Sequence, residues 1–217
     1  MASLYGDTHR ELQDAFGARN LADIVEKAVL REEIGEPEKA FIESRDMFFL
    51  STVDHKGRPT VSYKGGARGF VNVVDENTLA FPSYDGNGMY LSMGNVNGNT
   101  NVGLLFIDFE KPHRVRVQGN ASIQTNDPLL AEYNEAEMII RVHVTEIWKN
   151  CPRYIHKFQK IESSKYVPKE AEDTPMPDWK RLDILQSSLP PKDHGKTLKH
   201  GGTLTMEQLQ ALEQRDD

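Results

Sequence analysis

Between residues 46 and 150 the sequence consists of short runs in which apolar and polar side chains alternate. Arg114-Val115-Arg116-Val117 alternates strictly, and the run that starts at Ile140 does so again. Alternation with a period of two is typical of strands, because successive side chains of a strand point to opposite faces of the sheet. This region is therefore predicted to form about six or seven antiparallel strands, with one helical segment between the fourth and the fifth.

Turn-forming residues separate these runs. Gly57 and Pro59 lie between the first two runs, Asp75-Glu76-Asn77 between the next two, and Glu110-Lys111-Pro112 between a third pair. The number of strands fits a small barrel, and a sandwich of two sheets fits it almost as well. The fold class is predicted to be mainly β, with added helices.

Three regions are expected along the chain. Residues 1–37 are predicted to be a helical extension, residues 38–160 the β domain, and residues 161–217 a polar, proline-punctuated arm with short helices. The chain has 217 residues, which is enough for one domain with a core and appended helices.

Composition excludes several classes of protein. A net charge of -7 disfavours general nucleic-acid binding, because phosphate contacts need a basic surface. One cysteine excludes an internal disulfide framework and suits a reducing compartment. The N-terminal residues show no secretion or transit signal, and no apolar run approaches the roughly 20 residues that span a bilayer. A cytoplasmic location is expected, without nucleic-acid or membrane partners.

The stretch from Ser83 to Asn99, SYDGNGMYLSMGNVNGN, is rich in glycine, asparagine and hydroxyl side chains. A helix is predicted to begin near Asn87 or Gly88. Helix N-termini bind anions through unpaired backbone N–H groups, and glycines let an anion approach the backbone. Ser83 and Ser92 could add donors. A phosphate site and an ordinary connector between strands are both consistent with this stretch.

The run TVSYKGGARG places Ser62 and Lys64 on one strand face and Tyr63 on the other. Lys64 is a cation at the end of a strand otherwise suited to burial, where an ammonium group needs an anion. The alternative is that its side chain reaches solvent at the strand end.

Several segments resemble the pyridoxamine 5'-phosphate oxidase-like family of FMN-binding split barrels. They are MFFLSTVDHKGRPTVSYKGG, LAFPSYDGNGMYLSMGNVNGNTNVGLLFIDF and RVRVQGNA, within about residues 38–158. The later segment EIWKNCPRYIHKF is similar to a subgroup that carries an Asn-Cys-Pro-Arg-Tyr-Ile box. The resemblance implies a six-stranded antiparallel split β-barrel that binds FMN at the interface of a homodimer.

Site residues carried over from the resemblance fall into three groups. A strand beside the isoalloxazine ring would comprise Thr60, Val61, Ser62, Tyr63 and Lys64, with Lys64 toward the phosphate. The rest of FMN would be wrapped by Phe81, Pro82, Ser83, Tyr84, Asn87, Gly88, Met89, Tyr90 and Ser92. The partner subunit would be reached by Asn150, Cys151, Pro152, Arg153 and Tyr154.

Two departures argue against pyridoxamine phosphate as the substrate. Pyridoxamine phosphate oxidases proper have an Arg/Lys-rich phosphate clasp where this chain has GNGMYLS, and a W-x-x-R-like signature where it has the acidic EQLQALEQRDD. The resemblance therefore implies an FMN-dependent oxidoreductase that acts on another small organic molecule, with NADH or NADPH as a candidate electron donor. The alternatives are a non-catalytic flavin-binding or stress-response protein, and a split barrel that binds a deazaflavin or haem.

Other candidate groups indicate less. Cys151 precedes Pro152 and Arg153, so it is either a thiol activated by a nearby arginine or a small buried residue, and the second interpretation is preferred. His143 alternates within a predicted strand, and the histidines have no spacing suited to a closed metal site. No metal site and no catalytic acid or base is predicted.

Overall fold

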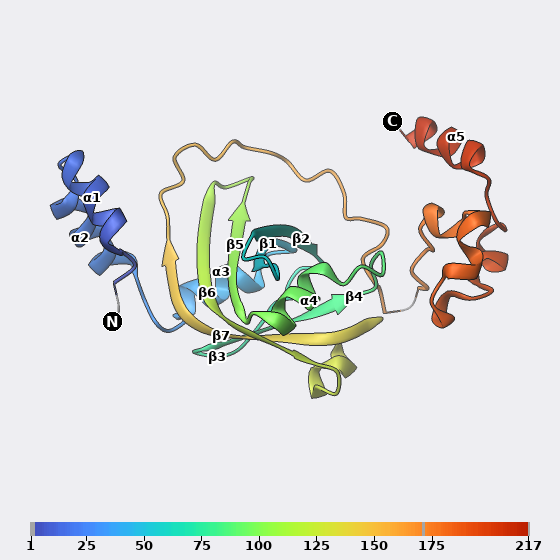
Figure 1. Ribbon diagram of the computed structural model, residues 1–217, viewed down its shortest axis with the longest axis horizontal. Coiled ribbons are helices and arrows are strands. Elements are labelled where there is room, and N and C mark those ends of the chain that lie inside the picture. The colour runs from blue at the N-terminus through green and yellow to red at the C-terminus, as the bar shows by residue number, and fades with distance from the viewer. Residues whose placement is uncertain (1–2, 171, 217) are drawn as a thin grey trace. The chain divides into compact units, whose positions relative to one another are not determined.

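The computed structural model describes residues 3–170 and 172–216. It divides into two compact units, Met1–Glu162 and Ser163–Asp217, which are described separately (Figure 1). The first unit contains, in chain order, helices α1 (Asp7–Ala15), α2 (Arg19–Val29) and α3 (Glu36–Glu43), strands β1 (Met47–Val53), β2 (Pro59–Gly65), β3 (Asn72–Asp75) and β4 (Thr78–Tyr84), helix α4 (Leu91–Gly98), strands β5 (Asn101–Asp108) and β6 (His113–Gln124), the 3₁₀ helix η1 (Pro128–Glu132) and strand β7 (Ala136–Lys149).

The strands form one antiparallel sheet in the order β2-β1-β5-β6-β7-β4-β3. The predicted mainly β antiparallel fold with added helices is confirmed, and α4 lies between the fourth and fifth strands as expected. The expectation of six strands in a barrel is wrong in two respects. The sheet has seven strands, because the short run Asn72–Asp75 pairs with β4 as a strand of its own. The barrel is also not closed, since β2 and β3 are the two ends of the strand order.

Alternation decides which side chains enter the core. In β1 and β5 every second residue is buried, and β6 repeats this over its central part. The aromatic centre of the core is Phe48, whose ring lies 5.0 Å from the ring of Phe81, 5.1 Å from Phe106 and 5.8 Å from Phe70. Aromatic rings at such separations add to the apolar area that the core buries.

The pairing of β6 with β7 is interrupted by a shift of register between Gln118 and Gly119. At Gly119 the two backbones approach so closely that a Cβ atom would lie 2.2 Å from the carbonyl oxygen of His143. No Cβ fits at that distance, so the bulge depends on glycine.

The β1–β2 turn is held by the carboxylate of Asp54. It accepts hydrogen bonds from the backbone N–H of Lys56 (2.8 Å) and of Arg58 (2.9 Å), and the Arg58 guanidinium lies 2.7 Å away. The turn closes with Gly57 in the left-handed region, at φ 75°. These contacts, of which the bond from the Arg58 side chain is the strongest, lower the pKa of Asp54 from 3.8 to about 2.

We expect the Asp54→Asn variant to melt below the wild-type protein at neutral pH. Because the folded-state pKa of Asp54 is depressed, its contribution to stability is complete above pH 3.8 and is lost as the pH falls to about 2. The difference in Tm between variant and wild type should therefore shrink over that interval, as measured by thermal unfolding at a series of pH values. The control is Asp173→Asn at an exposed position. A difference in Tm that stays constant from pH 5 to 2 (roughly the window in which a carboxylate titrates) would contradict the assignment.

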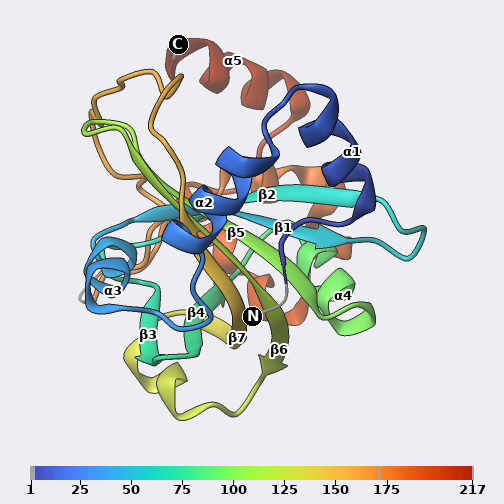
Figure 2. The same ribbon diagram turned by 90° about the vertical axis from the view of Figure 1, so that its left-hand side faces the viewer.

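Helices α1 and α2 form an N-terminal hairpin. All their residues are described, and none is buried. The chain is fixed to the sheet directly after α2, where the backbones of Arg31 and Ile147 exchange two hydrogen bonds of 2.9 Å. In Figure 1 the hairpin lies at the left-hand end of the first unit, and in Figure 2 it lies in front of the strands.

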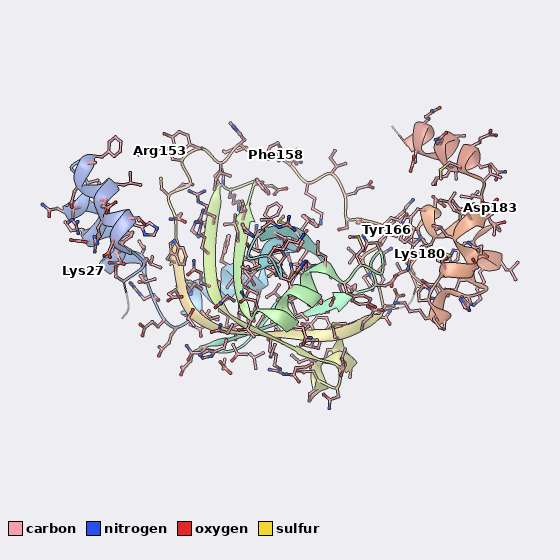
Figure 3. All side chains as sticks on the ribbon, in the orientation of Figure 1. Lys27, Arg153, Phe158, Tyr166, Lys180 and Asp183 are labelled. Atoms are coloured by element: carbon pink, nitrogen blue, oxygen red, sulfur yellow. The ribbon has the colours of Figure 1, made fainter. Side chains whose placement is uncertain are left out.

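The second unit contains the 3₁₀ helices η2 (Asp178–Arg181), η3 (Asp183–Ser188), η4 (Pro191–Asp193) and η5 (Lys196–His200), followed by helix α5 (Met206–Asp216). Its small core consists of Leu182, Leu204 and Leu209. Beside this core the buried ammonium of Lys180 lies 2.8 Å from the carboxylate of Asp193. Figure 3 labels Lys180 and Asp183 in this unit. The boundaries predicted at residues 37 and 160 stay a prediction.

Among the helices of the described residues, none has the length and hydropathy needed to cross a bilayer.

Candidate functional site

A cavity of about 300 Å³ opens between β2, the end of β4 and the start of α4. Its lining comes from two short stretches of chain that lie about 20 residues apart in the sequence. The lining residues are Ser62, Lys64, Ser83, Tyr84, Gly86, Asn87, Gly88, Met89, Tyr90, Leu91, Ser92 and Met93. The strand predicted to run along a ligand and the glycine-rich segment predicted to hold a phosphate therefore meet at one site.

Strand β2 presents alternate side chains to the cavity. Ser62 and Lys64 line it, while Val61 and Tyr63 point to the other face of the strand and are 69% and 63% exposed. Thr60 shares the face of Ser62, but its hydroxyl lies 2.8 Å from that of Thr52 and does not line the cavity. The alternation that the sequence predicted for this strand is confirmed.

Lys64 is the cation of the site. Its side chain is half-buried, and no hydrogen bond or ion pair joins its ammonium group to any other described residue. Burial lowers the pKa of Lys64 below its usual value of 10.5, because the charged form loses hydration without gaining a counter-ion. A half-buried ammonium group in this state favours an anion beside it.

The loop before α4 is held in an unusual backbone conformation. Gly88 and Tyr90 both adopt left-handed dihedral angles, with φ 77° and 47°, and the Asn87 side-chain oxygen accepts a bond of 3.1 Å from the Met89 N–H. Such angles are easy for glycine and uncommon for tyrosine. Tyr90 is anchored at its other end, where its hydroxyl donates a 2.9 Å bond to the carboxylate of Glu137.

The sequence predicted that the helix begins near Asn87 or Gly88, and this is wrong. Because of these angles, α4 begins at Leu91. Gly94 donates the first intrahelical bond, to the carbonyl of Tyr90. The N–H groups of Leu91, Ser92 and Met93 precede it and have no acceptor within the helix. They belong to residues that line the cavity, so the positive end of α4 lies at the same site as Lys64.

Side-chain hydrogen bonds connect α4 to β1 and β2. The Ser92 hydroxyl donates a 3.1 Å bond to the hydroxyl of Ser62. One turn further, the buried Asn95 amide donates to the hydroxyls of Thr52 (3.0 Å) and Thr60 (3.2 Å). The two walls of the cavity are therefore held in a fixed relation to each other. Tyr84, which completes the wall, has its pKa raised to about 12, chiefly by burial and then by Tyr133, so its hydroxyl stays protonated at neutral pH.

The remaining predicted residues lie elsewhere in the unit. Phe81 and Pro82 are buried in β4, and neither lines the cavity. The five residues of the Asn-Cys-Pro-Arg-Tyr box do not line the cavity. They lie on the chain that follows β7, where Figure 3 shows Arg153 beyond the ends of β5 and β6. The preferred interpretation of Cys151 as a small buried residue is wrong, because Cys151 is exposed. Its carbonyl accepts a 3.0 Å bond from Arg114. These positions stay predictions, since their proposed role is toward a second subunit.

Three lining residues were absent from the sequence-based set, namely Gly86, Leu91 and Met93. All three lie inside the glycine-rich stretch, next to Asn87 or Ser92. Those two predicted site residues were the signal in the sequence that could have pointed to them. Met89 lies before the helix, which begins at Leu91, and is 67% exposed. Within the described ranges, no group of three or more His, Cys, Asp and Glu residues could hold a metal ion.

The family model described as "Pyridoxamine 5'-phosphate oxidase" matches residues 34–154, which is more than half of the chain. The chain belongs to the pyridoxamine 5'-phosphate oxidase family. The resemblance inferred from the sequence is thereby confirmed at the level of the family, and the matched residues include β1 to β7, α4 and all the lining of the cavity. The subgroup defined by the Asn-Cys-Pro-Arg-Tyr-Ile box stays a prediction.

Solved structures related to the family include a putative pyridoxamine 5'-phosphate oxidase from Lactobacillus delbrueckii, 22% identical, at a TM-score of 0.45 over 54% of this chain and 95% of that chain. An FMN-binding protein from Syntrophomonas wolfei is 12% identical, at a TM-score of 0.43 over 64% and 97%. HutZ, the haem storage protein of Vibrio cholerae, is 20% identical, at a TM-score of 0.40 over 52% and 94%. Similarity at this level does not extend to ligand or activity. No curated protein matches the chain.

Proposed function

We propose that this protein binds FMN non-covalently in the cavity and uses it in the oxidation or reduction of a small organic molecule. The observation that carries the proposal is Lys64, a half-buried ammonium group with no ion-pair partner among the described residues. It lines one cavity together with the N-terminus of α4. A phosphate there would receive both a counter-ion and backbone donors.

The same residues account for the position of the phosphate. The hydroxyls of Ser62 and Ser92, 3.1 Å apart, lie between the strand that carries Lys64 and the helix that carries the free N–H groups. Gly86 and Gly88 have no side chain to obstruct an anion. The edge strand β2 leaves backbone groups available to the rim of a planar ring. Thr60, Val61 and Tyr63 would contact the ring through this backbone.

FMN, when bound, supplies the hydride chemistry, and the protein contributes binding, orientation and electrostatics. Lys64 is the one Lys or Arg among the described residues that line the cavity. One such group suffices for the phosphate of FMN and leaves none for a substrate that carries a second phosphate. We therefore propose a substrate other than pyridoxamine phosphate, with NADH or NADPH as the electron donor.

The partner in this proposal is a second copy of the chain. A cavity that opens at the edge of a sheet leaves part of its ligand uncovered, and a second subunit would complete the cover. Residues 150–154 are the proposed contribution of that subunit, because they lie outside the cavity of their own chain.

A flavin-binding protein without turnover is the second candidate. The observation in its favour is that the described residues of the cavity wall include no carboxylate and no imidazole, so general acid–base groups are missing from it.

Native mass spectrometry of the purified protein tests the proposal directly. We expect a dimer that carries one FMN per chain, either as purified or after incubation with FMN. A protein that stays free of flavin at saturating FMN would refute the assignment. If the bound ligand has the mass of haem or of a deazaflavin, the ligand is that molecule and not FMN. Addition of NADH or NADPH to the yellow protein then separates the two functions, because bleaching that reverses in air indicates an oxidoreductase and an unchanged spectrum indicates a binding protein.

A further inference from the structure

Glu137 binds a side chain of the cavity wall from a distant part of the chain. Its carboxylate accepts a 2.9 Å hydrogen bond from the hydroxyl of Tyr90, which lies 47 residues earlier and lines the cavity. Glu137 itself is not among the lining residues. It can therefore act on a ligand in the cavity in two ways, through its charge or through the position of Tyr90.

Strand β7 is irregular at the position of Glu137. Ser83 of β4 pairs with Met138 of β7. The next residue of β4, Tyr84, pairs with Ala136, so Glu137 is an extra residue in β7 and forms a bulge there. A bulge bends a strand and redirects a side chain, and bulges are frequent beside functional sites. This one lies opposite the last two residues of β4, and both of these line the cavity.

Tyr90 determines where α4 begins. Its φ of 47° and ψ of 28° are left-handed, and a residue with these angles cannot belong to a right-handed helix. The helix therefore starts at Leu91, and the N–H groups of Leu91, Ser92 and Met93 have no acceptor within it. If Met89 and Tyr90 were helical, the N–H groups of Ser92 and Met93 would bond to carbonyls four residues earlier. They would then be lost to a ligand in the cavity.

The left-handed conformation of Tyr90 needs a stabilising contact. For a residue with a side chain it is less favourable than the right-handed conformation by about 5- to 30-fold in the equilibrium constant. The local sequence also favours a helix that begins near Asn87 or Gly88. A hydrogen bond to a carboxylate has an effect of about the same size. The bond to Glu137 is therefore strong enough to offset the local preference.

We propose that Glu137 is a positioning residue for the phosphate site. By holding the hydroxyl of Tyr90, it maintains the left-handed turn that starts α4 at Leu91 and leaves the first N–H groups of the helix available to an anion. The inference rests on the proposed FMN site and adds a residue that does not touch the ligand. The charge of Glu137 alone would have the opposite effect, because a nearby negative charge weakens the binding of an anion. The direction of the change in affinity therefore separates the two roles.

Three variants of the full-length protein test this direction by fluorescence titration with FMN. Glu137→Ala removes the bond and should weaken FMN binding about tenfold, which corresponds to about 1.4 kcal/mol. Glu137→Gln keeps a carbonyl acceptor and should stay within about threefold of the wild type. Glu132→Ala removes the same charge at an exposed position and should bind FMN as the wild type does. Unchanged or tighter binding by Glu137→Ala, or an equal loss in Glu137→Gln, would overturn the proposal.

Tyr90→Gly in the Glu137→Ala background provides a rescue. Glycine adopts left-handed angles without steric cost and is unfavourable inside a helix, so α4 should again begin at Leu91 without the bond. We expect this double variant to bind FMN within about threefold of the wild type. A purely structural or electrostatic role of Glu137 would not be restored in this way. A double variant that binds as weakly as Glu137→Ala would contradict the proposal.

Amide hydrogen exchange of the FMN-free protein provides a readout that needs no ligand. In Glu137→Ala, the amides of Ser92 and Met93 should exchange about fivefold more slowly than in the wild type, because α4 extends backward and gives them acceptors. The double variant should restore their rapid exchange. The Asn99 amide, which donates to the carbonyl of Asn95 at 2.7 Å, is the control at the other end of α4 and should not change.

The exchange experiment also separates this inference from the proposed function. Unchanged exchange at Ser92 and Met93 in Glu137→Ala would refute the positioning role, whatever the protein binds. If the exchange changes as expected but the wild-type protein binds no FMN, the proposed function alone is refuted.

Discussion

Replacement of Lys64 by methionine is expected to weaken FMN binding while leaving the FMN-free protein as stable as before or more stable. The loss in affinity should be about 1–3 kcal/mol, the range for a charge-assisted contact, or roughly 5- to 150-fold in Kd. Stability should not fall, because methionine keeps the apolar stem and removes a desolvated ammonium group that has no ion-pair partner in the described residues. Fluorescence titration gives the affinity, and thermal unfolding without flavin gives the stability.

The matched control is Lys56→Met, at an exposed position in the β1–β2 turn. This variant should bind FMN as the wild type does. If Lys64→Met binds FMN with unchanged affinity, the phosphate does not lie at Lys64. If it lowers the Tm of the flavin-free protein, Lys64 has a structural role that the cavity does not explain.

The second large effect is expected from Phe48→Ala. Phe48 is completely buried, and its ring contacts those of Phe70, Phe81 and Phe106 at the centre of the sheet. Truncation of a buried phenylalanine to alanine removes its apolar contacts and leaves a cavity, at a cost of about 3–5 kcal/mol in the free energy of unfolding. Urea denaturation followed by circular dichroism measures this cost.

Phe158→Ala is the control for that experiment. Phe158 is 61% exposed and contacts the ring of Phe109 alone among the aromatic residues described. Its truncation should cost less than about 1 kcal/mol, as is usual at exposed positions. Similar costs for the two variants would mean that the aromatic cluster around Phe48 is not the centre of the core.

The fold was largely predictable because its information is local. The alternation in β1, β5 and β6 specifies which side chains are buried, and turn residues such as Gly57 mark where strands reverse. The number of strands and the opening of the barrel were harder to predict from the sequence. They depend on whether the short run at Asn72–Asp75 pairs with β4 and on whether β2 pairs with β3. Both are decided by tertiary structure.

The candidate site was also predictable in part. The residue types of Ser62, Lys64 and Ser92 indicated an anion site, and the structure brings all three to one cavity. The start of α4 was predicted too early, because Gly88 and Tyr90 adopt left-handed angles, and the hydroxyl of Tyr90 also donates to the carboxylate of Glu137, 47 residues further along the chain. Local sequence carries no signal for such a contact. Residues 150–154 are a further case, since a role across a subunit interface leaves no trace in the geometry of one chain.

The bulge at Gly119 has a consequence for the comparison of this protein with its relatives. A side chain at this position would meet the carbonyl of His143, so β6 and β7 could keep their pairing only by moving apart or by changing register. The strands on either side of the bulge would then shift relative to each other by a residue, and every inward-facing position beyond it would exchange with its outward-facing neighbour. Position 119 can therefore serve as a diagnostic in an alignment. Where a homologue has any amino acid other than glycine there, an alignment of β7 beyond the bulge needs a gap before its residues can be equated with those of this protein.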